Sequence, residues 1–527
     1  MSPLDFVSHA DYLIALLPEV ILALVSIVIL MVDVFRRGRG GTQSGPWVGH
    51  VALLGVLLAM AANAWLLRVS VTGDDALIAV DGFRVIANFI LLTGTLFTAL
   101  YAQEYLAREE LLIGEFFALL LLASVGMMIL VAARDLIVLF MGLELMSISV
   151  YVLTGFARHD PRSSEAALKY FIVGAFASAF LLFGIALVYG AAGSTHLGSV
   201  AARIAEASEE RDLILTAGIG LLLVGFGFKI AAVPFHMWTP DAYQGAPTPV
   251  TGYMATGVKA AAFVALLRLF TVDLAAAAPI WQTAVWWLAL LTMIVPNLIA
   301  LAQDDVKRML AYSSVAHAGY LLVGVMANSA VGRGAALFYL AAYTLMTIGA
   351  FAVVFHVAGK SDRRSYLSDY RGLGWRKPWL GLALVIFLLS LAGFPPTAGF
   401  VGKLYLLRAA IDAGETALAV ILVITSLVAY YYYLRVIWKM YFEATPADAE
   451  PVTSPGGGFR VATAVCAVGL LVFGLFPQAV VVRMGRAAAE VSPPAAVIRP
   501  TVPIVGAAGS LPTEVPAAVP GDEPTEP

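Results

Sequence analysis

The sequence predicts an all-α polytopic membrane protein of about 14 transmembrane helices, with two inverted five-helix repeats and two discontinuous helices. Of its 527 residues, 61% are hydrophobic and only 13% are charged, whereas a soluble domain carries about 25% charged residues. Apolar runs of about 20 residues, which suffice to span a bilayer, recur along nearly the whole chain. The connections between them are short and leave no room for a soluble domain.

Fourteen apolar runs qualify as membrane spans. They cover residues 11–34, 48–69, 83–103, 112–132, 135–157, 165–190, 212–238, 249–271, 281–302, 306–327, 335–358, 379–410, 417–442 and 461–482. The run 379–410 is too long for one straight span and contains Gly393-Phe394-Pro395-Pro396. Because proline breaks helices, we predict a discontinuous helix there and a second one in 212–238.

Composition excludes several classes of function. The net charge of −3 is too near neutral to suggest a nucleic-acid partner, and the single cysteine, Cys466, excludes a disulfide framework or a cysteine-ligated metal site within this chain. The sequence has no phosphate-binding glycine loop and no paired histidines at haem or metal spacing. We therefore expect no independent redox or hydrolytic chemistry.

Basic residues predict the orientation, since cytoplasmic loops are enriched in lysine and arginine. They follow the first, fifth, ninth and eleventh spans, all odd-numbered: Arg36, Arg37, Arg39, Arg158, Arg162, Lys307, Arg308, Lys360, Arg363, Arg364, Arg371, Arg376 and Lys377. The opposite loops are acidic, so both termini are expected to face outward. Arg483 and Arg486, just after the last span, run against this pattern.

The chain repeats itself at a constant shift of 169 residues. Under this shift AALKY (166–170) falls on AALFY (335–339), Asp135 on Asp304, Tyr151 on Tyr320 and Gly155 on Gly324. Five spans separate equivalent positions, and because five is odd the second copy must be inverted. Inverted repeats with discontinuous helices are typical of transporters, whose sites lie near the bilayer midplane.

The repeat divides the chain into five parts. We predict an N-terminal three-helix segment (1–111), a first antiporter-like repeat (112–272), a second, inverted repeat (273–442), a C-terminal transmembrane helix (443–486) and a disordered Pro/Ala-rich tail (487–527).

The stretch from Lys229 to Lys259 carries the strongest functional signal. Two lysines, His236, Asp241 and four prolines interrupt apolar sequence there. Intramembrane charges are costly and mark functional sites, and a broken helix is tolerated at membrane depth only where protein or water covers its freed backbone groups. The pattern favours part of an ion path.

Glu144 lies near the middle of the fifth span, where a carboxylate needs a partner or water. A Glu144–Lys229 pair would keep both groups charged, and separating them would let Lys229 release its proton. The alternative is a static buried ion pair. Lys169, near the cytoplasmic end of the next span, fits either this path or a lysine that snorkels to the interface.

Four further residues extend the predicted line. His236 is seven residues beyond Lys229, which on a continuous helix is two turns along the same face, about 10 Å away; it suits a proton shuttle or a packing role at the helix break. Lys259, His317 and Lys403 lie within later spans. Together with Glu144 and Lys229 they predict a polar line along the membrane plane.

At these motifs the chain resembles the antiporter-like membrane subunits of respiratory complex I. The resemblance rests on PFHMWTPDAYQGAPTPVTGYMATGVKAAAFVALLR (234–268), YSSVAHAGY (312–320) and SLAGFPPTAGFVGKLYLL (390–407), and it covers nearly all fourteen spans. It implies that Glu144 is the family's glutamate, Lys229 its central lysine, Lys259 the lysine of the following helix, Lys403 the exit-side lysine, His236 and His317 the bridging histidines, and Lys169 a further family lysine.

The resemblance also implies a setting. The chain would be a non-redox, proton-translocating subunit in the membrane arm of an NADH:quinone oxidoreductase in the bacterial inner membrane. Its partners would be membrane lipid, the small subunits near the quinone site and other antiporter-like subunits, with no nucleic acid. It would bind no cofactor itself, since NADH, flavin, iron–sulfur clusters and quinone belong to other subunits. The Pro-rich tail is a departure that the motifs do not explain.

Two other interpretations remain open from sequence. The same core would serve a subunit of a multi-subunit cation/proton antiporter that is no part of an enzyme. It would also serve a structural scaffold in which the buried charges only pair with one another.

Overall fold

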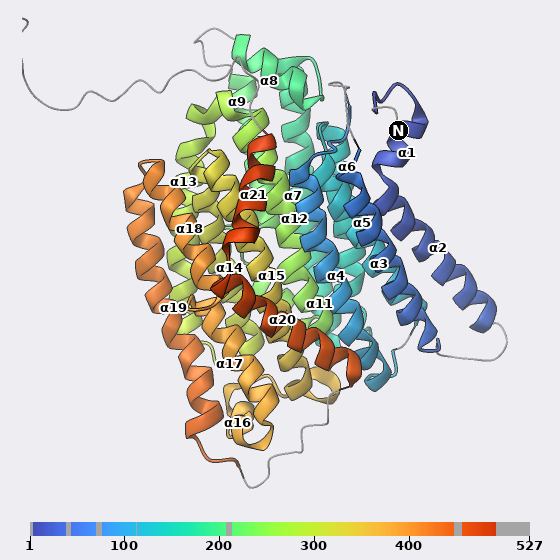
Figure 1. Ribbon diagram of the computed structural model, residues 1–527, viewed down its shortest axis with the longest axis vertical. Coiled ribbons are helices and arrows are strands. Elements are labelled where there is room, and N and C mark those ends of the chain that lie inside the picture. The colour runs from blue at the N-terminus through green and yellow to red at the C-terminus, as the bar shows by residue number, and fades with distance from the viewer. Residues whose placement is uncertain are drawn as a thin grey trace, which may run out of the picture.

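The computed structural model describes residues 4–37, 44–69, 76–111, 113–206, 213–446 and 456–491. They form a bundle of long helices that run largely alongside one another (Figure 1). Within these described ranges, twelve helical segments are long and apolar enough to cross a membrane, which confirms the all-α polytopic class. Eleven are α2 (Leu17–Arg37), α3 (Trp47–Leu66), α4 (Gly82–Arg108), α5 (Gly114–Ala132), α6 (Leu136–Thr154), α7 (Pro161–Ala192), α13 (Ala278–Leu301), α14 (Val306–Met326), α15 (Ala330–Ala358), α19 (Thr416–Phe442) and α20 (Gly457–Leu475).

The twelfth segment, Thr248–Asp273, changes its helical pitch along its length. It joins α11 (Thr248–Tyr253), the π-helix η1 (Met254–Val258), α12 (Lys259–Arg268) and a second π-helix, η2 (Leu269–Asp273). Its side chains are buried throughout, and those of α14 and α15 are nearly so. These segments form the centre of the bundle, where protein rather than lipid surrounds any polar side chain.

The predicted count of 14 spans is not confirmed, because helix breaks shorten two of them. α9 (Leu213–Lys229) and α17 (Pro378–Ala392) are apolar but shorter than the twelve long segments. After α9 the backbone takes a positive φ of 59° at Ala231 and a cis Val233–Pro234 peptide before α10 (Thr239–Gly245). After α17 it takes a positive φ of 88° at Gly393 and a cis Pro395–Pro396 peptide before α18 (Ala398–Asp412). Both breaks lie where the prolines predict them.

The two halves share a helix-capping device. Asp135 caps α6: its Oδ1 accepts the Ile137 N–H at 2.7 Å, and its Oδ2 accepts the Thr195 hydroxyl at 2.6 Å. Asp305 caps α14 in the same way, accepting the Arg308 N–H at 2.9 Å and the Ser365 hydroxyl at 2.5 Å. Such caps satisfy the first amides of a helix. The repeat predicted from sequence pairs Asp135 with Asp304, so the structural correspondence is offset by one residue at this end.

The C-terminal part differs from the sequence prediction. The last span, α20, ends at Leu475, and a separate amphipathic helix, α21 (Gln478–Glu490), packs on α15 and α4. The predicted tail boundary at residue 487 is therefore wrong, since α21 continues to Glu490. Residues 492–527, to which the disorder prediction applies, lie outside the described residues. The remaining short helices are α1 (His9–Ala15), α8 (Leu197–Glu206), η3 (Ala275–Ala277), η4 (Lys360–Asp362), η5 (Leu367–Tyr370) and α16 (Leu373–Arg376).

Candidate functional site

Lys229 is the last residue of α9 and its side chain is buried against α6. Its Nζ donates hydrogen bonds to Ser147 Oγ at 2.6 Å and to Tyr151 OH at 3.1 Å. The ammonium also lies 5.2 Å from the centre of the Tyr151 ring, within the range of a cation–π contact. The end of α9 thus places a lysine amine among hydroxyl groups deep in the protein.

Glu144 lies on α6, as Ser147 and Tyr151 do, but it does not contact Lys229. Its Oε1 accepts a hydrogen bond from the hydroxyl of Ser178 on α7, and no ion pair joins it to Lys229 among the described residues. Glu144, Ser147 and Tyr151 are spaced i, i+3 and i+7, so they share one face of α6. The direct pair of Glu144 and Lys229 is therefore absent from the described residues. Lys229 binds Ser147 and Tyr151 on this face of α6, and Glu144 lies on the same face without contacting it. Glu144 is also only half-buried, near the exposed Met141 and Ile148.

Lys259 begins α12 where the π-helix η1 ends. Its Nζ donates to the carbonyl oxygen of Ser314 at 2.7 Å and to the Ser314 hydroxyl at 2.5 Å. Tyr343 on α15 donates to the same hydroxyl at 2.8 Å. π-helical turns often occur at functional sites, and here one precedes a buried lysine at the centre of the bundle.

His317 joins three helices. Its Nδ1 shares a hydrogen bond with Tyr339 OH on α15 at 2.5 Å, and its Nε2 shares one with Tyr433 OH on α19 at 3.1 Å. Tyr433 OH in turn bonds to the hydroxyl of Ser313. The rings of His317 and Tyr343 lie 5.2 Å apart, so the histidine is next to the group that holds Lys259.

Lys403, on α18, reaches back across the second break. Its Nζ donates to the carbonyl oxygens of Ala392 at 2.9 Å and Leu391 at 3.2 Å. These are terminal carbonyls of α17, where the helix dipole favours a cation. The ammonium also lies 4.8 Å from the centre of the Tyr320 ring. Tyr320 is the repeat partner of Tyr151, so each half sets a tyrosine against the lysine at its helix break.

The structure separates two predicted residues from this arrangement. His236 is buried within the break between α9 and α10. The expectation that it lies two helical turns beyond Lys229 is wrong, because the helix ends at Lys229. Lys169 is half exposed and pairs with Glu165 at 2.7 Å and Asp241 at 2.9 Å, while Asp241 also pairs with Arg308 at 2.8 Å. Lys169 therefore belongs to a surface ion-pair cluster.

The carboxyl of Asp241 lies outside the membrane-spanning segments, and the cations of that cluster lower its pKa. Burial acts to raise its pKa, but hydrogen bonds from Lys169 and Arg308 outweigh burial and hold the pKa below its usual value. Asp241 is ionised at neutral pH and ties α10 to α7 and α14.

The sequence pointed to the hydroxyl of Ser314 near His317, but not to Ser147, which binds Lys229, or to the tyrosines at 339, 343 and 433, which bind His317 and Ser314. All of these side chains are buried within the bundle. The available signals were the Tyr151–Tyr320 match of the repeat and the run Tyr430-Tyr431-Tyr432-Tyr433 in α19. Within the described residues, no cluster of three or more His, Cys, Asp or Glu side chains could hold a metal ion.

A broken-helix bundle with buried lysines defines the class of antiporter-like membrane subunits. A family model described as "NADH:quinone oxidoreductase/Mrp antiporter, TM" matches residues 133–429. The chain belongs to this family.

Its relatives point to one member of the family. The chain is 45% identical to the NADH-quinone oxidoreductase subunit N of Trichlorobacter lovleyi, over 88% of this chain and 94% of the relative. It is 43% identical to subunit N of Gemmatimonas aurantiaca, over 93% and 96%. A chain of the Thermus thermophilus respiratory complex I with bound aureothin is 38% identical, with a TM-score of 0.74 and coverage of 88% and 98%. A chain of the Mrp complex of Dietzia shares the fold at 23% identity and a TM-score of 0.79.

Proposed function

We propose that this chain is a non-redox, proton-translocating membrane subunit of an NADH:quinone oxidoreductase, equivalent to subunit N of its relatives. The identity of 43–45% extends over most of each relative. The alternative, a subunit of an Mrp-type cation/proton antiporter, rests on a likeness of 23% identity, which supports the fold alone.

One observation carries the proposal: three lysines are buried within the bundle without a carboxylate partner. Lys229, Lys259 and Lys403 are 2%, 2% and 7% exposed, and none has an ion-pair partner among the described residues. Each is held by hydroxyl or carbonyl oxygens instead. Such oxygens accept a hydrogen bond from an ammonium or from a neutral amine. A proton can therefore leave the lysine without stranding an unpaired carboxylate, which disfavours the scaffold interpretation.

The arrangement supports distinct roles. Lys229 accepts and releases a proton beside α6, and the more distant Glu144 biases that step through its charge. Lys259, His317 and Lys403 pass the proton onward from the first repeat into the second. Within the described residues no hydrogen bond joins the Lys229 group to the Lys259 group, so transfer between them requires water.

The remaining assignments follow from this role. We propose that the chain lies in the bacterial inner membrane with both termini outward. The half-exposed Glu144 edge faces a neighbouring small subunit of the complex. The chain itself binds no flavin, iron–sulfur cluster or quinone. The parts 1–111, 112–272 and 273–442 act as an N-terminal segment and two repeats, the second of them inverted.

The test is the replacement Lys229→Ala in the intact complex. Proton pumping coupled to quinone reduction is expected to be lost, because no other amine occupies that position, while assembly persists. Pumping and quinone reduction would be measured together in proteoliposomes. Lys360→Ala is the matched control, since Lys360 is exposed and pairs with Glu110 at the surface.

Unchanged pumping in Lys229→Ala would overturn the role of that lysine. The composition of the purified assembly tests the class of protein separately. Co-elution with flavin and iron–sulfur proteins supports the oxidoreductase, whereas co-elution with other membrane subunits alone supports the antiporter.

A further inference from the structure

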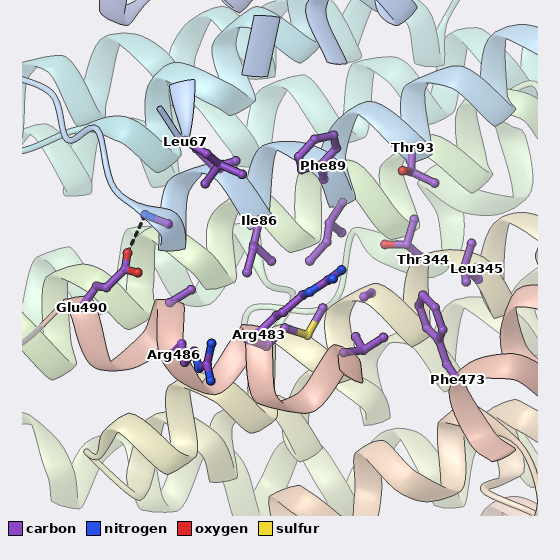
Figure 2. Close-up of a pocket in the computed structure, with 17 residues that line it drawn as sticks. Leu67, Ile86, Phe89, Thr93, Thr344, Leu345, Phe473, Arg483, Arg486 and Glu490 are labelled. Carbon is purple, nitrogen blue, oxygen red and sulfur yellow. Dashed lines mark hydrogen bonds between the residues drawn. The ribbon is translucent and has the colours of Figure 1, made fainter. Parts of the chain in front are cut away.

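A groove beside the amphipathic helix α21 is unrelated to the lysine line. It has a volume of about 520 Å³ and lies between α4, α15, α20 and α21. Most of its lining side chains are apolar, among them Ile86, Phe89, Leu345 and Phe473 (Figure 2). Cavities of this size commonly hold small organic ligands.

Two arginines of α21 line the same groove. The side chain of Arg483 extends from α21 toward Ile86 and Phe89, as Figure 2 shows. Among the described residues neither Arg483 nor Arg486 has a hydrogen-bond or ion-pair partner. The carboxylate at the end of the groove, Glu490, is already engaged, since its Oε2 accepts the Gly82 N–H at 2.8 Å. The groove thus combines apolar walls with two uncompensated cations.

The groove lies on a side of the bundle that lipid can reach. The neighbouring α20 exposes Val465, Val468 and Val472, as a helix surface in contact with acyl chains does. The two arginines also contradict the charge pattern of the loops, in which basic residues follow the odd-numbered spans. A ligand that neutralises them explains why basic residues occupy this position.

We propose that this groove binds one anionic phospholipid, with an acyl chain along the apolar walls and the phosphate on Arg483 and Arg486. Guanidinium groups match the geometry of phosphate oxygens. A soluble anion would leave the apolar walls uncovered, and an uncharged lipid would leave the arginines uncompensated. The lipid joins α21 to α4 and α15 beside the Gly82–Glu490 contact.

Native mass spectrometry of the intact assembly tests this site, after exchange into nanodiscs of equal parts phosphatidylglycerol and phosphatidylcholine. The wild-type assembly should retain one more phosphatidylglycerol than the double variant Arg483→Gln/Arg486→Gln, whose retention at this site should fall at least tenfold. Ala341→Phe, which fills the wall of the groove but keeps both arginines, should lose the same lipid. Arg203→Gln, an exposed arginine on the amphipathic helix α8, is the control and should retain it.

Three results would overturn the proposal. These are equal retention of the two phospholipids, unchanged phosphatidylglycerol in the double variant and in Ala341→Phe, or a helix of a neighbouring subunit seated in the groove in a map of the assembly. Because both variants leave the lysine line intact, this test does not depend on whether the proposed proton transfer is correct.

Discussion

At the scale of single residues, hydroxyl groups rather than carboxylates hold Lys229 and Lys259. Lys229 bonds to Ser147 and Tyr151, and Lys259 bonds to Ser314. A buried ion pair fixes both charges, since removing one partner leaves an uncompensated charge that costs about 3–5 kcal/mol. Hydroxyl partners impose no such penalty when the lysine changes its protonation state.

Gly174 on α7 makes the Tyr151–Lys229 contact possible. A Cβ at this position would lie only 2.0 Å from the Tyr151 hydroxyl oxygen. We predict that Gly174→Ala displaces the hydroxyl from Lys229 and slows coupled proton pumping by roughly tenfold, since a positioned proton-transfer group contributes a factor of about 10² or more. Pumping rates in proteoliposomes would measure this.

Gly190→Ala in the same helix is the control for this prediction, because a Cβ there meets no atom within 4 Å. Its pumping rate should match that of the wild type. Equal rates for Gly174→Ala and Gly190→Ala would show that the Tyr151 hydroxyl has no part in transfer.

At the scale of elements, the two helix breaks put cations and helix ends together. The break after α17 exposes terminal carbonyls, and Lys403 of α18 caps two of them. Such capping satisfies backbone groups that lipid could not. The π-helical turns on either side of α12 alter the pitch of the segment that carries Lys259.

Gly474 of α20 packs directly on the second break. A Cβ there would lie 2.0 Å from the Pro396 carbonyl oxygen and 2.6 Å from the Thr397 carbonyl carbon. We predict that Gly474→Ala lowers the free energy of unfolding by about 1–3 kcal/mol, the usual cost of overpacking. Because the break must shift to make room, pumping through Lys403 should also fall. Thermal unfolding in detergent and pumping assays would measure the two effects.

The paired variant Gly457→Ala lies near the start of α20, where a Cβ has no neighbour within 4 Å. It should unfold at the wild-type temperature. Identical unfolding curves for the two alanine variants would contradict the close packing of α20 on the break.

At the scale of the whole molecule, one ion pair connects the N-terminal three-helix segment to the central helix α12. Arg268 donates two hydrogen bonds to Asp81, the N-cap of α4, at 2.8 and 2.9 Å. Burial acts to raise the pKa of the Asp81 carboxyl, but the charge and hydrogen bonds of Arg268 outweigh burial and hold the pKa below its usual value. The pair therefore stabilises the folded chain at neutral pH.

We predict that Asp81→Asn destabilises the protein by about 3 kcal/mol at neutral pH, because it leaves the Arg268 charge buried without its partner. A carboxyl whose pKa is depressed by folding stabilises the protein above its unfolded pKa, and that stability is lost as the pH falls through the folded pKa. The difference between the two proteins should thus be constant above about pH 5 and shrink below about pH 4. Thermal unfolding of both proteins across this range would measure it, and a difference that grows in acid would contradict the assignment.

The sequence by itself determined the membrane class, the approximate positions of most spans, the two breaks and the lysines that lie beside them. These follow from composition, run length and proline, which act locally and are visible in a single chain. The repeat stays a prediction, and its shift of 169 residues misses the aspartate that caps α14 by one residue.

Only the tertiary structure decided what each cation touches. Glu144 and Lys229 do not pair, because side chains of α7 and α6 occupy their hydrogen-bonding groups. Lys169 belongs to a surface cluster because its partner Asp241 follows a helix break, and no local sequence pattern gives the direction of the chain after that break. The tyrosine partners of His317 come from α15 and α19, 22 and 116 residues further along the chain. Contacts between such distant residues depend on how helices pack, and packing is a property of the assembled bundle rather than of any one stretch of sequence.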